Sequence, residues 1–165
     1  MPIISVLKRA RVPCFYLMGN DDNVALGYED EQIKSLHGKR FSCGSYHLVG
    51  YQYTAPAFVG RLFVKSKEEM DQDLRSLEPR PKEPAVLVTH APAYGTLDRS
   101  WNGEHVGSRA LAALLDRTPV LAHIHGHIHG DFGRDGNRFN VAAAGQRVAV
   151  IIDVPLLEHE VIRAC

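Results

Sequence analysis

The chain has 165 residues, 45% of them hydrophobic, and its 19 basic and 19 acidic side chains leave no formal net charge when histidine is neutral. This length predicts one domain, residues 1–165, that buries about 70% of its unfolded surface, and the balanced charge argues against a nucleic-acid-binding protein. There is no signal peptide pattern, no apolar run near the ~20 residues that span a bilayer, and only three widely spaced cysteines, so we expect a cytoplasmic protein with no membrane contact.

The N-terminal half is predicted to hold two helices, a strand and a hairpin. Residues 2–11 form a short helix that leads into a strand at 14–18. Residues 41–64 are rich in Ser, Gly, Tyr and Val, and their alternation suits an antiparallel hairpin, which we assign to a second sheet. Ser66 opens a capping box, and the apolar spacing after it predicts an amphipathic helix over 66–77.

The C-terminal half is predicted to alternate strands and one helix. A buried strand at 85–89 is followed by a long loop and then by a helix over 109–117, for which Ser108 is the N-cap. Another strand spans 119–125. The rest of the chain is predicted to complete the second sheet with antiparallel strands after a glycine-rich turn at 131–136, namely 138–141, 147–153 and 159–162.

Polar side chains follow three of these strands, at the point where each strand ends. Asn20 comes after the first strand, His90 after the second, and His127 and His129 after the third. The carboxyl ends of neighbouring strands meet at one edge of a sheet, so these side chains are expected to converge. Imidazole and amide groups are neutral metal ligands. The pattern therefore predicts a metal site.

Two further histidines precede this last pair within the strand. His123 and His125 share one face of the strand, opposite Ala122 and Ile124. We interpret both as ordinary buried histidines that are hydrogen-bonded to backbone. For His125, a supporting role behind the metal ligands stays open.

The three polar segments resemble, in this order, blocks of the calcineurin-like metallophosphoesterases. The signature of that family runs Asp-x-His, Gly-Asp, Gly-Asn-His-Asp/Glu, a lone His, and Gly-His-x-His. The last three blocks correspond to residues 19–22, His90 and residues 126–129, and residues 88–108 are also similar to one branch of the family. The first two blocks are absent, because no Asp or His precedes Gly19.

The resemblance implies a fold, a metal site and a chemistry. The fold is a two-sheet α/β/β/α sandwich that here lacks its first strand-helix unit or units. The chemistry is two-metal hydrolysis of a phosphoester. Asn20, His90 and His127 are the implied ligands of one ion, and His129 is one ligand of the other. The intact site takes two divalent ions (Mn, Zn, Ni or Fe), and we expect one or none in this chain because the other ligands belong to the absent blocks.

Asp21 stands where the family usually has the His that protonates the leaving group. A carboxylate beside cations stays ionised, so it cannot be that acid; it is either an extra ligand or an exposed turn residue. The catalytic residues are therefore unknown. His105 and Ser108 flank a predicted helix N-terminus, where backbone amides favour phosphate, and they are candidates for substrate contact, with simple capping as the alternative.

These observations favour a metal-dependent phosphoesterase that acts on a small phosphodiester or activated monoester. The alternative is a non-catalytic metal- or phosphate-binding domain that has lost half of the site. Loss of the first two blocks also predicts a bare apolar sheet edge. Three explanations stay open: an open reading frame that starts upstream, a homo-oligomer or other partner that covers the edge, or a degenerate relative.

Overall fold

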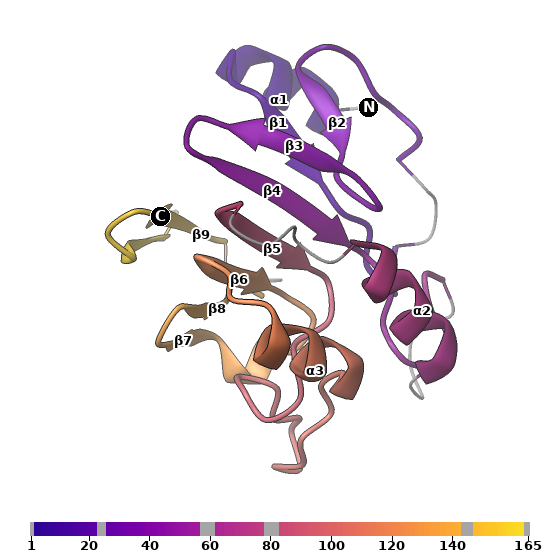
Figure 1. The fold of residues 1–165 in the computed structure, drawn as a ribbon. Coiled ribbons are helices and arrows are strands. Elements are labelled where there is room, and N and C mark those ends of the chain that lie inside the picture. The colour runs from indigo at the N-terminus through magenta and orange to yellow at the C-terminus, as the bar shows by residue number, and fades with distance from the viewer. Residues whose placement is uncertain (1, 23–25, 57–61, 78–82, 143–146, 164–165) are drawn as a thin grey trace.

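The computed structural model describes residues 2–22, 26–56, 62–77, 83–142 and 147–163. These residues form a central sheet of six strands in the order β3-β4-β5-β6-β8-β7 (Figure 1). Strands β4, β5, β6 and β8 run parallel, whereas β3 and β7 are antiparallel edge strands. Their bounds are Arg40–Cys43 for β3, Tyr46–Tyr51 for β4, Ala85–Thr89 for β5, Ala122–His125 for β6, Gly133–Asp135 for β7 and Arg138–Asn140 for β8.

Strand β5 is largely apolar because both faces of the sheet are covered where it lies. Val86 and Leu87 of β5 point to opposite faces of the sheet, and both side chains are fully buried. Two helices make the crossovers, α2 (Lys67–Leu77) between β4 and β5, and α3 (Arg109–Arg117) between β5 and β6. Because each crossover returns the chain to the same edge, β5 and β6 both end on the side where the candidate ligands follow.

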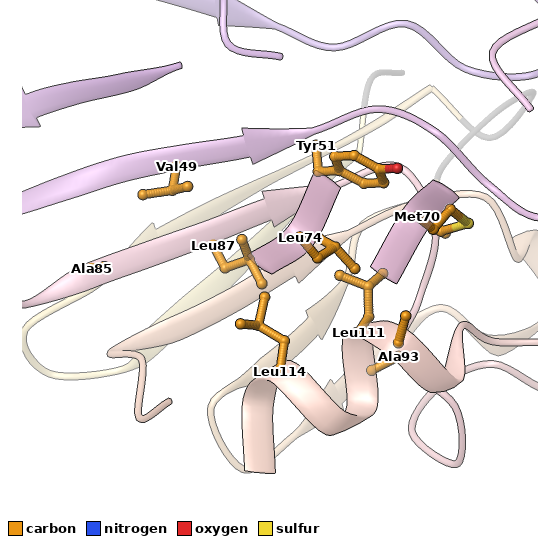
Figure 2. Close-up of a cluster of buried hydrophobic side chains, with 11 residues drawn as sticks. Val49, Tyr51, Met70, Leu74, Ala85, Leu87, Ala93, Leu111 and Leu114 are labelled. Atoms are coloured by element: carbon orange, nitrogen blue, oxygen red, sulfur yellow. The ribbon is translucent and has the colours of Figure 1, made fainter. Parts of the chain in front are cut away.

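Helices α2 and α3 pack together on one face of the central sheet (Figure 2). Ser66 and Glu69 form the expected capping box, in which the Ser66 amide donates to Glu69 Oε2 over 2.8 Å and the Glu69 amide donates to Ser66 Oγ over 3.2 Å. The helix therefore begins at Lys67, one residue after its cap. The buried cluster between helices and sheet includes Val49, Tyr51, Met70, Leu74, Leu87, Leu111 and Leu114.

Small sheets form the other layers. The antiparallel pair β9 (Val148–Asp153) and β10 (Glu158–Arg163) lies against the opposite face of the central sheet, where Val154 packs with Val86 and Phe139. The parallel pair β1 (Cys14–Tyr16) and β2 (Ile33–Ser35) is separate from the central sheet and follows helix α1 (Pro2–Ala10). In the described part of the chain, no helix is long and apolar enough to cross a membrane.

The elements predicted from the sequence are present, but two assignments to a second sheet were wrong. The hairpin within 41–64 exists as β3 and β4, yet β4 pairs in parallel with β5 in the central sheet. Residues 138–140 form β8, which pairs in parallel with β6, and the predicted turn at 131–136 contains strand β7. Alternation of side chains shows which residues share a face of a strand, but it does not reveal which strand lies alongside.

Candidate metal centre

Three segments that are distant in sequence meet at the carboxyl ends of the strands. Asn20 follows β1 and is 5% exposed, His90 follows β5, and His127 follows β6. Asn20 Oδ1 lies 2.8 Å from His90 Nε2, and the His90 and His127 rings pack edge to face with their centroids 4.8 Å apart. The Asn20 oxygen and the His90 ring nitrogen are thus hydrogen-bonded to each other.

Both histidines of this group are electrically neutral at physiological pH. Burial, reinforced by the nearby His127, lowers the pKa of His90 to about 4. Burial also lowers the pKa of His127, and the charge of Asp21 opposes that shift only in part. A neutral imidazole has a free electron pair on one ring nitrogen, which is the form that binds metal ions.

The other predicted site residues of this edge lie nearer to solvent. His129 is exposed at the start of a short 3₁₀ helix (His129–Asp131), and its charged form lowers the pKa of both His90 and His127. Asp21 is exposed and accepts a hydrogen bond of 3.2 Å from Asn20 Nδ2. Asp22 Oδ2 accepts from the Gly19 amide over 2.6 Å, which is the geometry of a tight polar turn.

Gly19 has a steric role that the sequence alone does not reveal. A Cβ atom at this position would lie 2.8 Å from His90 Cε1 and 3.2 and 3.3 Å from the two ring nitrogens. A side chain there would displace the imidazole, so glycine allows His90 to pack directly against the Asn20 turn. Gly126 differs, because a Cβ atom there would meet only the His90 carbonyl oxygen, at 3.9 Å.

His105 and Ser108 lie in the long loop after β5, which is organised around Asp98. Asp98 is fully buried and accepts hydrogen bonds from the amides of Gly95 and Gly107 and from His105 Nδ1. Burial alone raises the pKa of Asp98, but these hydrogen bonds outweigh it and the net pKa is lowered. Ser108 Oγ accepts from the Leu111 amide over 3.2 Å, so its side chain acts as the cap of α3.

His123 and His125 are buried on the helix-covered face of β6. His123 Nε2 lies 2.8 Å from Thr89 Oγ1, which also donates to the Ala91 carbonyl over 2.5 Å. Because the single hydroxyl hydrogen goes to Ala91, His123 must be the donor in its contact with Thr89. His125 Nδ1 contacts the Gly126 carbonyl at 3.3 Å, which is the backbone contact expected for a buried histidine. The remaining ring nitrogens, His123 Nδ1 and His125 Nε2, have no hydrogen-bond partner among the described residues.

A cleft of about 190 Å³ opens beside His90. Phe15 and Leu17 line it on the β1 side, and Val88 and Ile124 line it on the side of the central sheet. The walls are thus largely apolar.

The donor set of this edge fits part of a metal site. Asn20, His90 and His127 offer an amide oxygen and two neutral imidazoles, which suit a single transition-metal ion. Within the described ranges, however, no three His, Cys, Asp or Glu side chains lie close enough together to hold a metal ion. The described residues therefore bring neutral donors from three segments to this edge.

The model of the calcineurin-like phosphoesterase family matches residues 3–131, and the chain belongs to that family. A search of curated proteins finds no significant match.

Two solved structures show the same fold. One crystal structure superposes with a TM-score of 0.76 at 15% sequence identity, covering 98% of this chain and 70% of the other. The crystal structure of TT1561 of Thermus thermophilus superposes with a TM-score of 0.56 at 14% identity, covering 81% of this chain and 60% of the other. At these identities the similarity establishes the fold and leaves substrates open.

Proposed function

We propose that this protein hydrolyses a phosphodiester or an activated phosphomonoester with the help of divalent metal ions bound at the Asn20, His90 and His127 edge. The observation that carries the proposal is the convergence of an amide oxygen and two neutral imidazoles beside an apolar cleft. Family membership supports the class of reaction, because the matching family is that of the calcineurin-like phosphoesterases.

The roles of the residues follow from their chemistry. When bound, a divalent ion lowers the pKa of a coordinated water and neutralises charge on phosphoryl oxygens. Asn20, His90 and His127 are the proposed ligands of one ion, and the exposed His129 is the proposed ligand of a second. Burial keeps His90 and His127 unprotonated, so protons do not compete for the ring nitrogens near neutral pH.

The proposed leaving-group preference follows from Asp21. By the family resemblance, this exposed carboxylate takes the position of the residue that protonates the leaving oxygen, and bound cations would stabilise its ionised form. It therefore supplies no proton at neutral pH. Substrates whose leaving group is already a stable anion should be hydrolysed, whereas alkyl phosphates should react slowly.

The neutral ligands also predict which metal binds. Without a carboxylate, the set of two imidazoles and one amide should bind Zn²⁺ or Ni²⁺ more tightly than Mn²⁺, because hard ions need anionic oxygen ligands to replace their water. Competition titrations of the purified protein measure this order directly. Mn²⁺ affinity equal to that for Zn²⁺ would contradict it and would indicate that Asp21 or Asp22 is a ligand.

Hydrolysis of bis(p-nitrophenyl) phosphate in the presence of Zn²⁺, Ni²⁺ or Mn²⁺ tests the catalytic proposal. We expect release of p-nitrophenol that depends on the metal and is lost in His127→Ala. The second candidate function, a metal- or phosphate-binding domain without catalysis, is favoured by the lack of a cluster of three acidic, histidine or cysteine ligands among the described residues. Tight Zn²⁺ binding without turnover of this substrate would establish that alternative over hydrolysis.

A further inference from the structure

The loop that carries His127 and His129, residues 126–131, has a conformation that its own sequence does not enforce. His127 adopts φ of 71°, in the left-handed region that is unfavourable for a residue with a Cβ atom. Within this ligand loop, the Ile128 amide donates to the Gly126 carbonyl over 2.9 Å, and the Asp131 amide donates to the Ile128 carbonyl over 3.3 Å. Glycines at positions 126 and 130 add conformational freedom, so contacts from elsewhere must hold His127 in place.

One such contact is the hydrogen bond of 3.2 Å that the Gly126 amide donates to the His90 carbonyl, at the start of the loop. The contacts to the middle and the end of the loop come from Asn140, a buried side chain at the end of β8. Asn140 is 1% exposed, and its Nδ2 lies 2.7 Å from the Ile128 carbonyl and 2.9 Å from the Asp131 carbonyl, with the Leu97 carbonyl at 3.3 Å. Its Oδ1 accepts from the Ala142 amide over 3.0 Å. The two amide hydrogens therefore tie the middle and the end of the ligand loop to the central sheet.

Asp131, at the end of the ligand loop, is also connected to the long loop after β5. Asp131 Oδ2 accepts from the Arg99 amide over 2.8 Å, and Leu97 shares the Asn140 donor. Asn140 thus lies where the ligand loop, the long loop and β8 meet. An aspartate at position 140 would keep the same shape but would present an oxygen to two carbonyl oxygens at less than 3 Å, which is repulsive.

We propose that Asn140 is a positioning residue, which holds the ligand loop in the conformation that directs His127 towards His90 and thereby determines the affinity for the divalent cation. Only the part that concerns the cation rests on the proposed function. The part that concerns the loop stands on the hydrogen bonds of Asn140 alone. Side chains that orient metal ligands typically change metal affinity by about 10- to 100-fold when they are replaced.

The chain offers a matched control in Asn137. Its Nδ2 donates to the Val120 carbonyl over 2.9 Å and reaches the Leu121 carbonyl at 3.3 Å, at the other end of β6. Asn137→Asp makes the same chemical change in the same kind of contact but leaves the ligand loop alone. Asn140→Ala and Asn137→Ala form a second pair, in which no charge is introduced, in case Asn140→Asp does not fold.

Two measurements on the full chain test the proposal, after circular dichroism has shown that each variant is folded. Amide hydrogen exchange without metal should speed up at Ile128 and Asp131 in the position-140 variants and stay at the wild-type rate in the position-137 variants. Isothermal titration with Zn²⁺ should show a loss of about 10- to 100-fold in affinity for the position-140 variants only.

Each outcome decides one part of the proposal. Unchanged exchange and unchanged Zn²⁺ affinity in the position-140 variants would overturn it, as would an equal loss in the position-137 variants. Faster exchange without a change in affinity would overturn the part that concerns the cation. A wild-type chain that binds no Zn²⁺ would overturn both the proposed metal site and the proposed effect of Asn140 on cation affinity. The exchange rates would still decide whether Asn140 holds the loop.

Discussion

Replacement of Gly19 by alanine should weaken metal binding without lowering the stability of the fold. The added Cβ would lie 2.8 Å from His90 Cε1, whereas ordinary contacts begin near 3.4 Å, so the imidazole has to move by about 0.6 Å. Asn20 holds this ring at its Nε2 atom and His127 packs against it, so the displacement changes the arrangement of all three proposed ligands. A ligand displaced by this distance should bind Zn²⁺ about 10- to 100-fold more weakly, the range seen when the orientation of a ligand is disturbed.

The free energy of unfolding of Gly19→Ala should be slightly higher than that of the wild type or nearly the same. Gly19 has no left-handed φ, so alanine is compatible with its backbone. Such a replacement reduces the conformational freedom of the unfolded chain and stabilises a protein by ~0.4–1 kcal/mol, which offsets the cost of moving one partly buried ring. Urea unfolding of the metal-free protein should therefore show a free energy of unfolding close to that of the wild type.

Gly126→Ala is the control. Gly126 directly precedes His127, and the family motifs contain a glycine at position 126 as they do at position 19. A Cβ atom at position 126, however, would meet only one atom, at an ordinary distance. Isothermal titration with Zn²⁺ should show a loss of affinity for Gly19→Ala and little change for Gly126→Ala. Wild-type affinity in Gly19→Ala, or an equal loss in both variants, would refute the steric reasoning.

Two further predictions concern ligands and protons. His90→Ala and His127→Ala should each abolish Zn²⁺ binding and hydrolysis of an activated phosphodiester, whereas Asp21→Ala should leave both largely intact; a complete loss in Asp21→Ala would identify this residue as a ligand or an acid. The free energy of unfolding should fall as the pH is lowered from about 6.5 to about 4, because burial lowers the pKa of His90 and His125 to about 4 and the unfolded chain binds those protons first. Urea titrations across this range measure the slope, which should become shallower in His125→Phe; a flat profile in the wild type would contradict the assignment of neutral buried imidazoles.

Local features of the sequence determined several helices and strands. The helix over 67–77 follows from a capping box and apolar spacing, both of which act within a few residues and are fully visible in the chain. The strand over 85–89 follows from a short run of apolar, mostly β-branched residues that suits a position buried on both faces. The proximity of His90 and His127 was also predictable, because β5 and β6 are parallel neighbours whose carboxyl ends lie at one edge. Asn20 follows β1, which belongs to a separate sheet, so only the tertiary structure decides its place beside His90.

Contacts between distant segments decided the remainder. Strands β4 and β8 joined the central sheet in parallel rather than forming a second sheet, since pairing depends on a neighbour that lies far away in sequence. Gly19 matters through its distance to the ring of His90, which is remote in sequence, and Asn140 through carbonyl oxygens of two other loops. Residue type and spacing identify which side chains have suitable chemistry, but hydrogen bonds and steric contacts across the fold determine how those side chains are held.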